Sequence, residues 1–132
     1  MGAKFEGTFF FSIDGTRHEL EPGHVVWLGT FKGQFFNPGG FMHDTTWDCP
    51  GITENKDGKS QASCGYLIVT DSDGDKAWAE WKGRLEIKEG KISGMASWRG
   101  GAGKFNGISG PLTYEGNVKP TGQGSAKVEG NY

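Results

Sequence analysis

The sequence has few of the features that mark membrane proteins, nucleic-acid-binding proteins or common hydrolases. No apolar run approaches the ~18 residues that a membrane-spanning helix needs. The formal net charge is −2, and lysine and arginine are mixed among the acidic residues, so no basic stripe for nucleic acid is present. A Gly-x-Ser-x-Gly elbow is missing, as is a carboxylate pair with an evident role. We therefore expect no membrane span and no nucleic-acid partner.

Cysteine is also scarce, with Cys49 and Cys64 on separate expected strands. The two thiols could form a disulfide or remain buried and free, and two cysteines alone do not define a zinc site. The chain as given begins without the apolar segment of a signal peptide. Two locations therefore remain open: the cytoplasm, or an exported protein whose leader has been removed.

A helical pattern is missing as well, because apolar residues never keep a 3.6-residue period for ten residues. Glycine is abundant instead, at 24 of 132 residues, and is spread among aromatic and branched side chains. The segments 14–23 and 50–60 are expected to be loops, and Asp73-Gly74 a hairpin turn. Alternation of apolar and polar residues predicts strands over 4–13, 24–36, 40–49, 61–71, 75–87, 91–100, 109–118 and 122–132.

Eight strands joined mostly by short turns predict one all-β domain over residues 1–132. The expected architecture is an antiparallel up-and-down barrel, similar to that of lipocalins. Glycines inside the strand patterns favour a barrel, because they allow strong curvature and leave room for large side chains from across the lumen.

The glycine-rich stretch WRGGAGKFNGISG, residues 98–110, could be mistaken for a phosphate-binding loop. A Walker A loop needs a glycine where Trp98 stands, and Ser or Thr where Phe105 follows the lysine. The apolar residues Trp98, Phe105 and Ile108 also argue against a flexible linker. We predict a strand end and a tight structural turn at the barrel rim.

This stretch, the DSDGDKAWAEWKG hairpin before it and the GPLTYEG strand after it resemble allene oxide cyclases, dirigent proteins and related small bacterial barrels. The resemblance covers roughly residues 61–117. It implies the barrel fold, with the glycine-rich turn as a corner between strands. It also implies a homo-oligomer, trimer or dimer, for which Trp78 on an otherwise polar face is the candidate contact. The resemblance implies no single reaction, because this fold hosts several functions.

The inward positions of the expected strands are rich in aromatic residues, which either fill the core or line a cavity for an apolar ligand. The candidate ligand-binding residues are Trp27, Phe31, Trp47, Tyr66, Trp81, Trp98 and Tyr114. His43 is the candidate catalytic residue, because an inward histidine among aromatics could act as a neutral general base. The alternative for His43 is a buried structural histidine bonded to the backbone or to Thr45.

We expect no metal ion and no cofactor. HELEPGH does not match the His-Glu-x-x-His pattern of zinc enzymes. DSDGD resembles the start of a calcium-binding loop, but its glycine stands at the fourth position and a lysine at the twelfth.

Three functions remain open from the sequence. The first is a barrel that binds an apolar or conjugated small molecule without catalysis. The second is a cofactor-free cyclase or isomerase that folds a reactive polyene or polyketide-like substrate against aromatic walls. The third is a structural or oligomeric barrel with a packed core. A lumen above ~300 Å³ would favour the first two, and a filled lumen the third.

Overall fold

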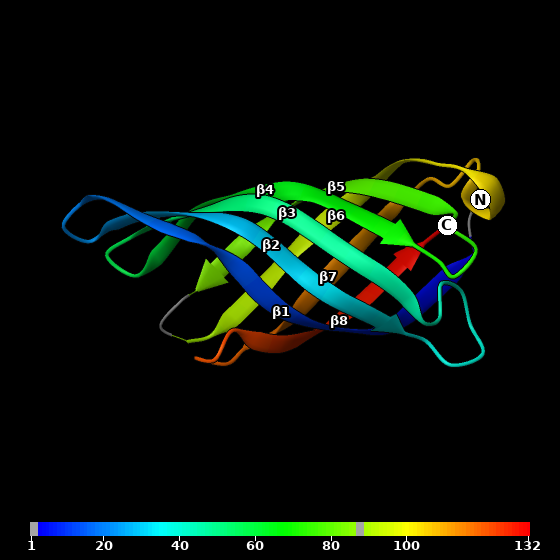
Figure 1. Cartoon of the computed structure of the whole chain (residues 1–132), viewed down its shortest axis with the longest axis horizontal. Helices are drawn as coiled ribbons and strands as arrows, with labels where there is room; N and C mark the ends of the chain where they lie inside the picture. Colours follow the sequence, from blue (N-terminus) through cyan, green and yellow to red (C-terminus); the bar gives the residue numbers. More distant parts are fainter. Residues whose placement is uncertain (1–2, 87–88) are drawn as a thin grey trace.

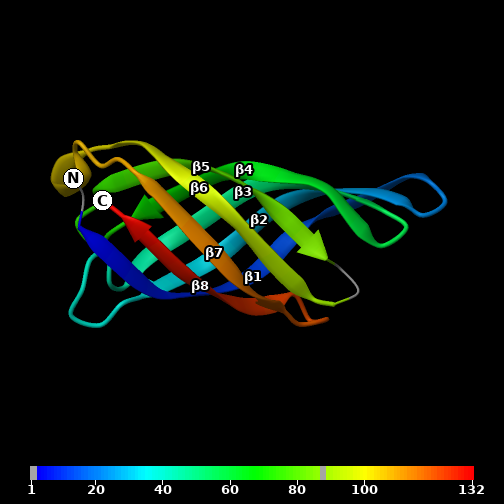
Figure 2. The same ribbon diagram turned by 180° about the vertical axis from the view of Figure 1, so that it is seen from behind.

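The computed structural model describes residues 3–86 and 89–132. These residues form the strands β1 (Lys4–Glu21), β2 (His24–Phe36), β3 (Thr45–Lys56), β4 (Lys59–Thr70), β5 (Lys76–Glu86), β6 (Lys91–Gly101), β7 (Pro111–Val118) and β8 (Gln123–Asn131), and the short 3-10 helix η1 (Gly103–Phe105). Each strand pairs with the next, and β8 pairs with β1, so the sheet closes into an antiparallel up-and-down barrel (Figures 1 and 2). The predicted all-β eight-stranded barrel is confirmed. Residue 87, which the prediction includes in the fifth strand, lies outside the described residues.

Tight turns connect β1 to β2 and β3 to β4, and a slightly longer turn connects β4 to β5 at the other end of the barrel. At the expected Asp73-Gly74 turn, the Asp71 amide donates to the Asp75 carbonyl at 3.0 Å, and Gly74 has φ 84°. Asp57 and Gly58 form a second tight turn, with φ values of 54° and 82°. Asp-Gly pairs suit such turns because both residues tolerate positive φ. The prediction of a hairpin turn at Asp73-Gly74 is confirmed.

Two long hairpins, β1–β2 and β3–β4, extend from one end of the barrel (Figure 1). The prediction of loops at 14–23 and 50–60 was therefore wrong. Residues 14–23 are all exposed, so neither face of this hairpin is buried and no apolar alternation marks it as a strand. Over 50–60 the inward positions hold buried polar residues, Thr53, Asn55 and Ser60, in place of apolar ones.

The opposite end of the barrel is closed by aromatic rings, and the glycine-rich stretch supplies one of them. β6 ends at Gly101 and η1 follows, which turns Phe105 into the core. Phe41 stacks on Tyr132 with ring centroids 3.6 Å apart, and Phe5 and Phe105 pack edge-on against Phe41 at 5.4 and 5.9 Å. Residues 98–110 thus form a strand end and a structural turn, as predicted.

Lys104 fastens this turn to the β4–β5 hairpin. Its Nζ lies 2.6 Å from a carboxylate oxygen of Asp71 and 2.7 Å from one of Asp73. Its backbone amide donates to the Asp75 carboxylate at 3.2 Å. The hydrogen bond from Lys104 lowers the pKa of the Asp71 carboxyl, and the same bond raises the pKa of Lys104. The lysine of the glycine-rich stretch therefore has a structural role: it holds the turn against the β4–β5 hairpin.

Candidate functional site

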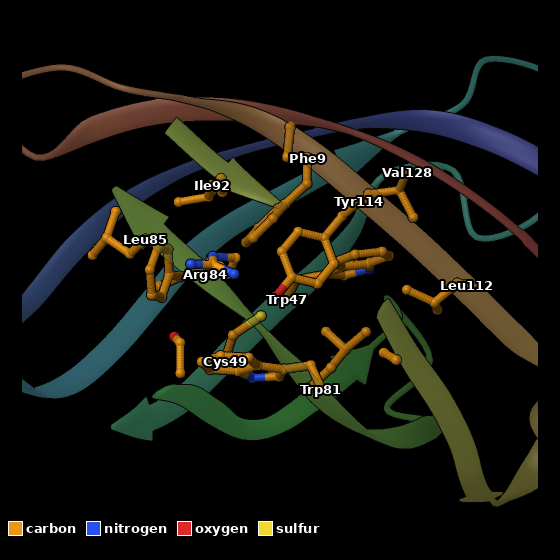
Figure 3. Close-up of a pocket in the computed structure, with 15 residues that line it drawn as sticks. Phe9, Trp47, Cys49, Trp81, Arg84, Leu85, Ile92, Leu112, Tyr114 and Val128 are labelled. Atoms are coloured by element: carbon orange, nitrogen blue, oxygen red, sulfur yellow. The ribbon is translucent and has the colours of Figure 1, made fainter. Parts of the chain in front are cut away.

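The barrel encloses a cavity of about 60 Å³ that side chains from all eight strands line (Figure 3). Its lining is almost entirely apolar. Ligand pockets usually measure ~300–1,000 Å³, so this cavity is much smaller than a usual ligand pocket. The side chains of the lining fill most of the lumen. The apolar members of the lining are Phe9, Phe31, Trp47, Leu67, Trp81, Leu85, Ile92, Ala96, Leu112, Ala126 and Val128.

Two tryptophans form a fixed wall of this cavity. Trp47 stacks on Phe35 with centroids 4.5 Å apart and planes 12° apart, and its indole N–H donates to Thr45 Oγ1 at 2.9 Å. The Trp81 indole N–H donates to the Tyr66 carbonyl at 3.0 Å. Because both N–H groups have partners, the two rings are held in place and present apolar surface to the cavity.

The Tyr114 side chain lies against the backbone of two glycines, Gly83 and Gly94. Gly94 pairs with Tyr114 on β7 and with Gly83 on β5. A Cβ atom at either glycine would overlap the Tyr114 hydroxyl. The missing side chains therefore make room for the phenol, whose hydroxyl points toward Cys49 (Figure 3).

Burial changes the titration of two polar groups in the cavity, Cys49 and Tyr114. Burial raises the pKa of the Cys49 thiol, and neighbouring Asp48 adds to the shift. Burial also raises the pKa of Tyr114, with Cys49 adding to it. Both groups stay protonated at neutral pH, so neither serves as a nucleophile or base there. Ser63 shares a hydrogen bond of 2.9 Å with Thr53.

The cavity approaches solvent at the end of the barrel where β5 ends and β6 begins. Leu85 and Ile92 line it there, together with Arg84, whose side chain is 66% exposed. Arg84 donates to Glu86 at 3.2 Å. The aromatic rings around Phe41 close the other end, so we assign the mouth of the cavity to Leu85, Ile92 and Arg84.

The structure brings four of the expected ligand-binding residues to the cavity: Phe31, Trp47, Trp81 and Tyr114. Trp27 and Trp98 also face inward but pack in the core away from it. Trp27 is half-buried against Phe31, with centroids 5.8 Å apart, and Trp98 is 6% exposed.

Tyr66 was wrongly expected to face inward. It lies on the outer face of β4 and is 52% exposed, whereas Leu67 and Val69 point into the core. The run Tyr66-Leu-Ile-Val69 is apolar at every position, so alternation could not distinguish the two faces. A register irregularity between Glu54 and Asn55 in the β3–β4 pairing also interrupts the period.

The expectation that His43 faces the lumen was also wrong. β3 begins at Thr45, and His43 lies exposed in the preceding turn. Met42 and Asp44 on either side both have φ 61°, a conformation that alternation does not reveal. His43 Nδ1 accepts a hydrogen bond of 3.0 Å from the backbone N–H of Asn37. The residue is therefore part of the β2–β3 turn and does not reach the cavity.

The two cysteines do not form the disulfide that the sequence left open. Both thiols are free: Cys49 is buried and faces the cavity, and Cys64 is exposed on the outer side of β4. They lie on opposite faces of the barrel wall, so a bond between them is sterically excluded.

Sequence reasoning missed much of the aliphatic lining. Leu67, Ile92, Ala96, Leu112, Ala126 and Val128 line the cavity with Ser63. The alternation over 91–100, 109–118 and 122–132 carried the signal for five of them, because it places them on the inward phase. A search restricted to aromatic and titratable residues passed over them.

Comparison with known families and with curated proteins finds no match to this sequence. The resemblance to allene oxide cyclases and dirigent proteins therefore stays a prediction. Within residues 3–86 and 89–132, no group of three His, Cys, Asp or Glu side chains is placed to hold a metal ion. The same residues contain no helix long and apolar enough to cross a membrane.

Proposed function

We propose that the protein is a small-molecule-binding barrel that holds a slender, uncharged apolar ligand in its lumen. The observation that carries this proposal is the apolar cavity of about 60 Å³ at the centre of the barrel. Packed cores rarely contain voids larger than a water molecule, which needs only ~10–15 Å³. The apolar lining offers a water molecule few hydrogen bonds, so an apolar occupant suits the cavity better.

The cavity also has a measurable cost if it stays empty. At ~24 cal/mol per Å³, a void of this size destabilises the fold by about 1.4 kcal/mol. Ala96 and Ala126 line the void, so one or two added methyl groups would fill it. Alanine at these positions leaves the space that a binding site requires.

The volume limits the ligand. A cavity of ~150 Å³ accepts benzene or xenon, so this lumen takes a molecule of a few non-hydrogen atoms or the slim end of a longer one. In the second case the remainder would pass Leu85 and Ile92 to the solvent. A charged group inside the lumen would be strongly disfavoured by desolvation.

The cyclase or isomerase hypothesis finds less support. A polyene or polyketide-like substrate needs several times the observed volume. Cys49 and Tyr114 remain protonated, and His43 lies outside the lumen. The packed structural barrel is the competing hypothesis, and the ~300 Å³ criterion favours it, because the cavity measures only about 60 Å³. The binding proposal rests instead on the cavity being apolar and several times larger than the space that one water molecule needs.

The test is a titration with cyclopropane and n-pentane, which are both slimmer than benzene, followed by tryptophan fluorescence and by NMR shifts of the Trp47 and Trp81 indole groups. We expect a saturable response that Ala96→Val and Ala126→Val abolish. Ser97→Val, at an exposed position next to Ala96, is the matched control and should bind like the wild type. No saturable response to either probe, or an equal response from the Ala96→Val and Ser97→Val proteins, would favour the packed barrel.

A further inference from the structure

The lumen has one polar end, which is the end that Leu85 lines and that lies away from Leu112 (Figure 3). Four polar side chains of β3 and β4 are buried there, none of them more than 7% exposed. They are called below the polar end: Thr53, Asn55, Ser60 and Ser63. Buried polar groups are nearly always hydrogen-bonded in folded proteins, so the partners of this group can be counted one by one.

Two members of the polar end join it to the cavity. Ser63 lines the cavity and shares its hydrogen bond of 2.9 Å with Thr53. The Ser60 hydroxyl accepts a hydrogen bond of 3.3 Å from the backbone N–H of Leu85, which lines the cavity at its mouth. Asn55 lies just beyond the lining, opposite Ser60 and two residues from Thr53 on the same face of β3. Asn55 therefore stands between the two places where the polar end meets the cavity.

The wall of the barrel is joined differently beside the polar end. Within the described residues, the ladder between β4 and β5 ends at the pair Cys64–Lys82. Nearer the mouth, side chains join the two strands: besides the Leu85 bond, the backbone N–H of Ser60 donates to a carboxylate oxygen of Glu86 at 3.5 Å. A ligand group can therefore approach the polar end here without displacing a ladder hydrogen bond.

The hydrogen-bonding groups left over at the polar end are one acceptor and one donor. Asn55 Oδ1 is buried and has no hydrogen-bond partner in the part of the chain that the structure describes. Thr53 and Ser63 share one hydrogen bond, so one of their two hydroxyl hydrogens remains for a third group. A hydroxyl group both donates and accepts, so it could donate to Asn55 Oδ1 and accept from the Thr53–Ser63 pair.

We infer that the lumen binds a slender aliphatic primary alcohol, with its hydroxyl at the polar end and its chain against Trp47 and Trp81. This inference rests on the proposed function and names the class of ligand. The cavity of about 60 Å³ limits the chain to a few carbon atoms, as in 1-propanol or 1-butanol.

Other head groups match the polar end less well. An alkane leaves both the Asn55 acceptor and the hydroxyl donor without a partner. An ionised carboxylate has no hydrogen to donate to Asn55, and an ammonium group cannot accept one from the Thr53–Ser63 pair. Both ions are also costly to transfer from water into an apolar lumen.

The experiment compares 1-butanol with n-pentane, a chain with the same number of non-hydrogen atoms, in titrations followed by NMR shifts of the Trp47 and Trp81 indole groups. Asn55→Leu is the test variant, because it removes the acceptor at nearly constant size. Asn117→Leu is the matched control, because Asn117 is exposed on β7. We expect Asn55→Leu to weaken 1-butanol binding at least about tenfold and n-pentane binding less than about twofold, the loss of one buried hydrogen bond. Asn117→Leu should change neither.

Two further measurements guard against a variant that does not fold. Asn55→Leu should be at least as stable as the wild type in urea, because it removes an unpaired buried oxygen. If it does not fold, Ser63→Ala takes its place and should weaken 1-butanol without weakening n-pentane. Sodium butyrate, the carboxylate of the same chain length, should not bind.

The outcomes separate this inference from the proposed function. A wild-type protein that binds n-pentane but not 1-butanol would overturn the inference and leave the proposed function standing. The same holds if Asn55→Leu or Ser63→Ala weakens both ligands equally or neither, or if butyrate binds as tightly as 1-butanol. A wild-type protein that binds neither n-pentane nor 1-butanol would overturn both.

Discussion

Two buried alanines give a paired test of the cavity. Ala96 lies opposite Trp81 and Leu112, and all three line the void, whereas Ala79 lies opposite Leu67 and Trp98 and is 0% exposed without lining it. Replacement by valine adds two methyl groups at each position. Both residues are in strands, so the higher strand propensity of valine contributes similarly to both variants.

The two substitutions should change the free energy of unfolding in opposite directions. At position 96 the added methyl groups enter existing space, and their transfer from water contributes up to ~1.6 kcal/mol. At position 79 they overpack the core, which costs about 1–3 kcal/mol. Ala96→Val should therefore be more stable than Ala79→Val by about 2–4 kcal/mol. Urea unfolding followed by tryptophan fluorescence measures the difference, provided that both variants keep the wild-type m value. Equal destabilisation by the two substitutions would refute a usable void beside Ala96.

Three further predictions concern other parts of the barrel. Gly33→Ala should prevent folding, because the added Cβ atom would overlap the Phe10 carbonyl. Gly39→Ala is the comparison: its Cβ atom would meet open space, and the φ of 75° should cost only ~1 kcal/mol. Soluble yield and thermal melting compare the two variants. Lys104→Met should destabilise the protein at pH 5–8, and the gap to wild type should close as the pH falls. The sign of this pH dependence follows from the pKa of Asp71, which Lys104 lowers. The ion pair therefore stabilises the fold above the unfolded pKa of ~3.9 and stops doing so below the folded pKa. A stability gap that is unchanged at pH 2 in urea titrations would contradict the ion-pair account. A thiol reagent should modify one cysteine, Cys64, in native protein and both in denaturant, and fast modification of two native thiols would contradict the burial of Cys49.

The sequence predicted the fold where one face of a strand is apolar and the other polar. Strand β5, which follows the Asp73-Gly74 turn, shows this best: Ala77, Ala79 and Trp81 are buried, and Lys82 and Arg84 are exposed. In the projecting part of β1–β2 both faces meet solvent, and in YLIV on β4 both faces are apolar. Alternation carries no information in either case, so the strand was missed in the first and Tyr66 was assigned to the wrong face in the second.

The candidate site was predictable only in outline. Alternation placed Phe31, Trp47, Trp81 and Tyr114 inward, and each lines the cavity. The volume of the cavity depends on how side chains from eight strands fit together, which no local pattern specifies. His43 was misplaced because the φ values of Met42 and Asp44 define a turn with residues that rarely adopt it.

The most direct test of the lumen as a binding site is a crystal of the wild-type protein pressurised with xenon. Xenon is apolar and nearly spherical, and it enters dry apolar cavities without needing a polar partner. The account predicts one xenon atom inside the barrel, between Trp47, Trp81 and Tyr114, and none there in Ala96→Val crystals. A lumen without xenon in the wild-type protein, or xenon bound only among the aromatic rings around Phe41, would contradict it.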